Sequence, residues 1–145
     1  MGLTRISPDE AYRLMRDEGY VYLDVRTPEE FAQGHPARAY NIPIMVPAAH
    51  GMVEYADFIT VARAAFEPET KIVVGCRSGN RSQAAAKRLL DAGFSHVVEQ
   101  RAGWAGARDP FGRAGELGWQ ASGLPHAEEP EPGRDHETLA ARARQ

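Results

Sequence analysis

The sequence lacks the features that mark several classes of protein. One cysteine in 145 residues cannot form an internal disulfide, so a reducing cytoplasm is the expected compartment. No apolar run approaches the roughly 20 residues of a membrane span, and the start of the chain has no apolar signal core. Positive charge is not in excess, because 17 Lys and Arg face 20 Asp and Glu. We therefore expect a cytoplasmic protein that binds neither membranes nor nucleic acids.

Metal-ligand spacing is also missing from the sequence. The five histidines are scattered along the chain, so we expect no zinc site and no bound metal. His35 is expected to make a buried structural hydrogen bond. The composition, with 43% apolar and 26% charged residues, suits one globular domain with a substantial core.

Strand-like and helix-like segments alternate along the chain. Helix starts are indicated by Ser7-Pro8 and by Thr27-Pro28, and glycines mark the ends of these helices. The predicted helices cover 8–18, 28–33, 55–66 and 81–92, and the predicted strands cover 20–25, 39–42, 71–75 and 95–99. Residues 44–54 are predicted to form a loop. This order predicts an α/β fold, a single domain with a mainly parallel central sheet flanked by helices.

The C-terminal third changes in character after Gly103. It is rich in glycine, and we expect an irregular wrap anchored by its large apolar residues, Trp104, Phe111, Leu117 and Trp119. Beyond Pro125 the chain is acidic and proline-rich, with little to bury. The predicted domain therefore covers residues 5–125, and residues 126–145 are predicted to be a flexible tail.

The only cysteine stands in the run Cys76-Arg77-Ser78-Gly79-Asn80-Arg81, between a predicted buried strand and a predicted helix. A helix N-terminus and neighbouring cations stabilise a thiolate, which is the nucleophilic form of cysteine. Gly79 permits a positive-φ turn, so that backbone N–H groups of residues 77–81 point into one concavity. A lone cysteine is more often a small buried apolar residue, but this setting favours a nucleophile.

Two separated motifs resemble the rhodanese (thiosulfate sulfurtransferase) family. The first is Leu23-Asp24-Val25-Arg26-Thr27-Pro28-Glu29-Glu30-Phe31, followed by Gly34-His35 and Asn41-Ile42-Pro43. The second is the Cys76 loop, and Gly103-Trp104 resembles the C-terminal part of small single-domain members. The resemblance covers about residues 5–125. The turn at residues 35–39 departs from the family's usual His-Ile-Pro-Gly-Ala.

The resemblance implies a single rhodanese-like domain in which Cys76 is the catalytic nucleophile and carries a persulfide. The substrate-binding residues would be those of the rest of the loop, Arg77, Ser78, Gly79, Asn80 and Arg81. The donor would be thiosulfate and the acceptor cyanide, a small thiol or a protein thiol, with no cofactor. Asp24 and Arg26 would form a structural pair. One loop arginine is expected to bind the substrate anion and the other to pair with a carboxylate; the sequence leaves open which. It also leaves open a monomer or a homodimer.

Two alternatives accompany this interpretation. The first is a relay module that delivers persulfide sulfur to a partner protein. The second is a phosphatase or arsenate reductase. Four residues separate Cys76 from Arg81, whereas rhodanese-like phosphatases have one residue more, and the sequence has no second cysteine to resolve an oxidised thiol. Both observations disfavour the second alternative.

Overall fold

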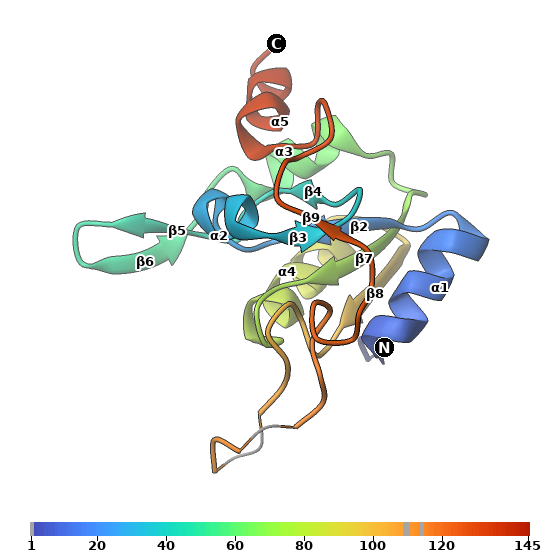
Figure 1. Cartoon of the computed structure of the whole chain (residues 1–145). Coiled ribbons are helices and arrows are strands. Elements are labelled where there is room, and N and C mark those ends of the chain that lie inside the picture. The colour runs from blue at the N-terminus through green and yellow to red at the C-terminus, as the bar shows by residue number, and fades with distance from the viewer. Residues whose placement is uncertain (1, 109–110, 114) are drawn as a thin grey trace.

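A five-stranded parallel sheet forms the centre of the molecule (Figure 1). The computed structural model describes residues 2–108, 111–113 and 115–145. The sheet order is β1 (Arg5–Ile6), β8 (His96–Gln100), β7 (Lys71–Gly75), β2 (Val21–Asp24) and β4 (Tyr40–Asn41). The predicted α/β class, with its parallel sheet flanked by helices, is confirmed.

The helices begin where the sequence predicts N-caps. The Ser7 side chain accepts the Glu10 N–H at the start of α1 (Pro8–Glu18), and Thr27 and Glu30 form a reciprocal capping box for α2 (Pro28–Gln33). The remaining helices are α3 (Phe58–Ala65), α4 (Asn80–Asp91) and α5 (His136–Ala143). The α3 helix is shorter than the predicted 55–66, because residues 56–57 form a turn before it. No helix in the described part of the chain is long and apolar enough to cross a membrane.

Apolar side chains cover both faces of the sheet. Successive strand residues point to opposite faces, so Leu23 and Val74 belong to one cluster and Tyr22 and Val73 to the other. Helices α3, α4 and α5 contribute to the first cluster, and α1 packs against the opposite face (Figure 1). Burial on both faces explains why β2 and β7 read as continuous apolar runs in the sequence.

Residues 44–54 differ from the predicted loop. They contain a two-stranded antiparallel hairpin, β5 (Met45–Ala48) and β6 (Gly51–Glu54), which projects from the rest of the molecule (Figure 1). Val46 lies opposite Val53, and Gly51 has a φ of 113° at the turn. The hairpin lacks a buried face in β6, so it shows no apolar/polar alternation that would have identified it.

Residues 126–145 also differ from the predicted flexible tail. β9 (His126–Ala127) pairs antiparallel with β3 (His35–Pro36), and the Arg134 carbonyl accepts the Asn41 N–H at 2.9 Å. Leu139 on α5 is 1% exposed and belongs to the main core cluster. The composition of this segment predicts flexibility because it has few apolar residues, but a few specific contacts hold the segment in place.

The predicted anchors of the glycine-rich segment divide into two groups. Trp119 is fully buried, and the half-buried Trp104 packs against the same cluster. Phe111 is 82% exposed and Leu117 is 60% exposed, so these two do not anchor the segment in the core.

A candidate active site at Cys76

The Cys76 loop begins at the carboxyl end of β7, and its backbone is held by a neighbouring segment. The carbonyls of Cys76 and Arg77 accept the N–H groups of Trp104 and Ala105, each at 2.8 Å. Gly103 makes this approach possible, because a Cβ atom at this position would overlap both carbonyl oxygens. Backbone hydrogen bonds from the segment after Gly103 therefore hold the start of the loop.

Cys76 is 3% exposed, and its sulfur has two polar neighbours. The Gly79 N–H donates to Sγ at 3.1 Å, and the Ser82 Oγ lies 3.3 Å from Sγ. Gly79 has a φ of 104° and is the N-cap of α4, so the sulfur lies beside the first turn of that helix. A helix N-terminus and a backbone N–H donor both favour negative charge on sulfur.

The other loop residues that the sequence predicts for the site lie around this sulfur in different settings. Arg77, Ser78 and Asn80 are exposed. Arg77 lines a cavity of about 600 Å³ together with Arg26 and Trp104. With Ser78 and Asn80 it also lines a second cavity of about 300 Å³. Arg77 therefore borders both cavities.

Arg81 is instead engaged by a carboxylate. Its guanidinium donates to both carboxylate oxygens of Glu30 on α2, at 2.7 and 3.0 Å. Burial raises the pKa of Glu30, but the Arg81 guanidinium and the Thr27 backbone N–H outweigh burial and lower it to about 2. The hydrogen bonds from Arg81 also raise the pKa of that guanidinium. Of the two loop arginines, Arg81 therefore has the carboxylate partner.

Asp24 and Arg26 form a buried ion pair at 2.7 Å. The Arg26 guanidinium also donates to the Gly34 carbonyl at 2.6 Å and lies 5.1 Å from the Trp104 ring centroid. His35 is buried, with its Nδ1 2.7 Å from the Phe31 carbonyl, as the sequence predicts. These contacts tie the end of β2 to α2, which fits the structural role expected for the pair, and they place Arg26 along the wall of the larger cavity.

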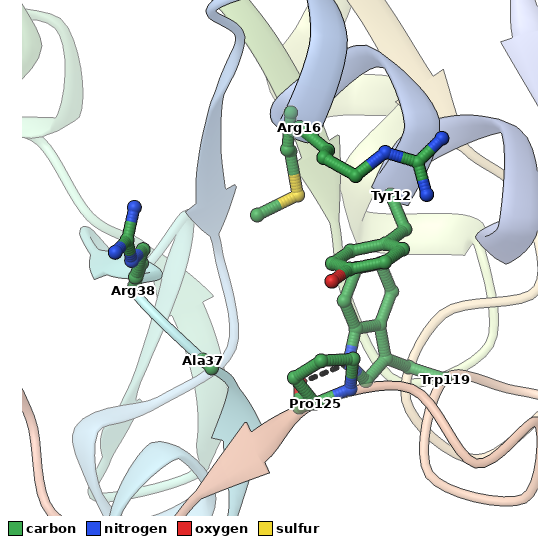
Figure 2. Close-up of a pocket in the computed structure, with 7 residues that line it drawn as sticks. Tyr12, Arg16, Ala37, Arg38, Trp119 and Pro125 are labelled. Carbon is green, nitrogen blue, oxygen red and sulfur yellow. Dashed lines mark hydrogen bonds between the residues drawn. The ribbon is translucent and has the colours of Figure 1, made fainter.

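A separate hollow of about 360 Å³ lies on the α1 side of the sheet (Figure 2). It is lined by Tyr12, Met15, Arg16, Ala37, Arg38, Trp119 and Pro125. The dashed line in Figure 2 is the hydrogen bond from the Trp119 indole N–H to the Pro125 carbonyl, at 2.8 Å. None of its lining residues belongs to the Cys76 loop, so this hollow is not part of the candidate site.

Sequence reasoning missed three residues around Cys76. Glu30 holds Arg81, and Glu99 on β8 accepts a hydrogen bond from the Ser82 hydroxyl. Arg5 pairs with Glu99 at 2.6 Å. A signal for Glu99 was present, since a carboxylate inside an apolar strand of a parallel sheet is buried and needs a partner. Among the described residues, no group of three or more His, Cys, Asp or Glu side chains is arranged to hold a metal ion.

Residues 7–108 match the family model of the rhodanese-like domain. The chain is 41% identical over 97 residues to the senescence-associated protein DIN1 of Raphanus sativus, covering 67% of this chain and 53% of that protein. The chain therefore spans about half the length of this relative. It is 43% identical over 107 residues to thiosulfate sulfurtransferase 16, chloroplastic, of Arabidopsis thaliana, covering 74% of this chain and 79% of that protein.

A similar fold is found in the crystal structure of Rv0390 from M. tuberculosis. The TM-score is 0.73 at 26% sequence identity, and the alignment covers 89% of this chain and 100% of that one. The whole of that protein is therefore matched by most of this chain.

Proposed function

The chain belongs to the rhodanese-like domain family, and on that premise we propose that it is a sulfurtransferase that moves the sulfane sulfur of thiosulfate to a thiophilic acceptor. The observation that carries the proposal is the position of the Cys76 sulfur. It is buried at the carboxyl end of β7, beside the first turn of α4, and it accepts the Gly79 N–H. The relative named thiosulfate sulfurtransferase 16 supports the choice of donor.

The proposed reaction has two displacements at sulfur. The Cys76 thiolate attacks the outer sulfur of thiosulfate, a new S–S bond forms, and sulfite leaves with the electrons of the broken bond. The acceptor then attacks the outer sulfur of the Cys76 persulfide, and the Cys76 thiolate leaves. With cyanide as acceptor the product is thiocyanate. The scheme uses no metal and no organic cofactor.

Each loop residue has a proposed role. Arg77, exposed at two cavities, binds the anionic donor, and the backbone N–H groups of residues 77–81 hold the persulfide, with Gly79 already donating to the sulfur. Ser78 and Asn80 line the same entrance as Arg77. Arg81, fixed by Glu30, keeps one wall of the loop in place and adds positive charge near the sulfur.

Thiosulfate:cyanide turnover tests the proposal. We expect activity in the wild type, none in Cys76→Ala, and the mass of one added sulfur on the wild-type chain after thiosulfate alone. Arg77→Ala is expected to raise KM for thiosulfate about tenfold, because a charge-assisted hydrogen bond is lost. Arg142→Ala on α5, an exposed arginine on another element, is the matched control and keeps the wild-type KM. Equal turnover in wild type and Cys76→Ala would refute the assignment.

A relay to a protein thiol is a second candidate, favoured by the hairpin. Met52 and Val53 on β6 are 43% and 47% exposed. Met45 and Glu54 at the base of the hairpin share a cavity of about 210 Å³ with Asn80 and Arg81 of the Cys76 loop. A protein acceptor docked on the hairpin would thus lie beside the loop. The two functions are separated by deleting the hairpin. A relay predicts that transfer of labelled sulfur to the protein acceptor stops while cyanide turnover continues.

A further inference from the structure

Glu99 is a buried carboxylate that the proposed sulfur exchange does not use. It lies on β8 and is 0% exposed. One of its oxygens, Oε1, accepts the Arg5 Nε–H at 2.6 Å, and the other, Oε2, accepts a hydrogen bond from the Ser82 hydroxyl. A buried carboxylate costs stability unless both oxygens find donors, and here they do. The second donor is the side chain that also contacts the Cys76 sulfur.

The direction of the hydrogen bonds from Cys76 to Glu99 follows from counting protons. A serine hydroxyl has a single proton to donate. Because the Ser82 proton is given to Glu99, its oxygen accepts from Cys76, and the sulfur 3.3 Å away is the donor. The chain therefore runs from the Cys76 S–H through the Ser82 O–H to the Glu99 carboxylate. The side chains of all three are buried, so the path is shielded from water.

We propose that Glu99 is the internal proton acceptor of the Cys76 thiol, acting through Ser82; the inference deepens the proposed sulfur transfer and rests on it. The Cys76 S–H bond breaks and its proton passes to the Ser82 oxygen, while the Ser82 hydroxyl proton passes to Oε2 of Glu99. The products are a thiolate and a neutral carboxylic acid, and the net charge of the group is unchanged. The new Ser82 O–H then points to the thiolate, which gains a second donor beside the Gly79 N–H.

The surrounding groups allow this transfer. Arg5 from β1 is the cation that faces Glu99, and its side chain is 39% exposed, so water solvates it when Glu99 becomes neutral. From α4, Arg81 lies near Cys76 but turns to Glu30. From β2, Tyr22 lies against Gly75, and burial raises the pKa of its hydroxyl, which stays neutral.

An internal acceptor leaves a distinct signature in the pH dependence of thiol reactivity. A thiol that releases its proton to water loses its thiolate tenfold per pH unit on the acidic side of its titration. A thiol that shares one proton with a fixed acceptor keeps a constant thiolate fraction for as long as the pair holds that proton. The rate of alkylation then reaches a plateau at acidic pH instead of continuing to fall.

Alkylation of the full chain by iodoacetamide between pH 5 and 9 measures this directly, because Cys76 is the only thiol. We expect a plateau in the wild type and its loss in Glu99→Gln, which should react at least tenfold more slowly at pH 6. A through-space effect has the opposite sign, since removing a negative charge near the sulfur favours the thiolate. A Glu99→Gln rate at pH 6 equal to or above that of the wild type would overturn the proposal.

Three further variants keep the test independent of any folding defect in Glu99→Gln. Ser82→Ala should lose the plateau, and Ser82→Thr, which restores a hydroxyl, should recover it. Arg5→Gln removes the cation paired with Glu99, so Glu99 becomes the better acceptor and the pH 6 rate should rise several-fold. A fall in the Arg5→Gln rate, or a plateau retained in Ser82→Ala, would contradict the relay. Alkylation needs neither thiosulfate nor acceptor, so these outcomes leave the proposed function to its own turnover test.

Discussion

Gly79 combines a backbone conformation that favours glycine with a hydrogen bond to the Cys76 sulfur. Its φ of 104° lies in the left-handed region, and its N–H donates to the Cys76 sulfur. A Cβ atom here would lie 2.5 Å from the Arg101 carbonyl oxygen. The backbone conformation that caps α4 is therefore also the one that holds the sulfur.

Replacing Gly79 by alanine is expected to lower the free energy of unfolding by more than the cost of a positive φ alone. Positive φ costs a non-glycine residue about 1–2 kcal/mol, and the contact with the Arg101 carbonyl adds to this. Gly93→Ala is the matched control, because Gly93 has a φ of 102° and open space around its Cβ position. Urea unfolding should show a larger loss in Gly79→Ala than in Gly93→Ala, together with slower Cys76 alkylation only in the former. Equal losses in the two variants would mean that the loop accommodates a side chain.

The Glu30–Arg81 ion pair predicts a pH dependence of stability. The pKa of Glu30 is about 2 in the folded chain against 4.5 ordinarily, so its contribution is present above pH 4.5 and is lost as the pH falls towards 2. Because the pair is partly open to solvent, we expect this contribution to be about 1 kcal/mol. Urea unfolding at pH 6 and pH 3 should show a smaller loss of stability in Glu30→Gln than in the wild type.

The control for this measurement is Glu29→Gln on the same turn, where the side chain is exposed. It should keep the pH dependence of the wild type. If Glu30→Gln also keeps that dependence, the ion pair contributes nothing to stability in solution, and Arg81 is then free to turn towards a substrate anion.

At the scale of elements, the β5–β6 hairpin stands apart from the core. All four residues of β6 are exposed, and the hydrogen bond from the Tyr55 N–H to the Ile44 carbonyl closes its base at 2.8 Å. This hydrogen bond holds residues 44 and 55 next to each other, so a short turn could replace the hairpin between them. A hairpin that adds little to the core but exposes apolar side chains beside the Cys76 loop is suited to contact with another molecule.

A variant in which a short glycine–serine turn replaces residues 46–53 tests whether the hairpin is separate from the core and from the small-molecule site. Since these residues bury little, the free energy of unfolding should change by less than about 1 kcal/mol, and thiosulfate:cyanide turnover should stay within about twofold of the wild type. Sulfur transfer to a protein acceptor should fall if the relay function holds. A large drop in cyanide turnover would instead make the hairpin part of the small-molecule site.

Local rules predicted most of the elements but not the contacts between them. Ser7 and Thr27 predicted the starts of two helices because capping depends on residues within one turn. Cys76 was predicted at a strand end because strand, turn and helix signals lie next to it in the sequence. The strand pattern indicated that Glu99 is buried, but its partners were missed because Ser82 is 17 residues away and Arg5 is 94 residues away. Such pairings depend on sheet order, which no local pattern specifies.

At the scale of the whole molecule, the main core cluster connects the C-terminal helix to the Cys76 loop. This cluster contains both Leu139 on α5 and Cys76, with side chains of β2, β7, α3 and α4 between them. Residues 126–145 are also held by β9 pairing and by the Asn41–Arg134 backbone hydrogen bond. The segment after Pro125 therefore completes the fold.

Leu139→Ala should accordingly destabilise the whole domain rather than one helix. Truncating a fully buried leucine costs about 2–4 kcal/mol, and the cost should appear as a lower midpoint of a single cooperative transition. Circular dichroism and Cys76 alkylation under urea should report the same midpoint, because α5 and the loop share one core. Arg142→Ala, exposed on the same helix, should leave the midpoint nearly unchanged. Two separate transitions in Leu139→Ala, with alkylation following only the second, would show that α5 melts independently and that the domain is complete without it.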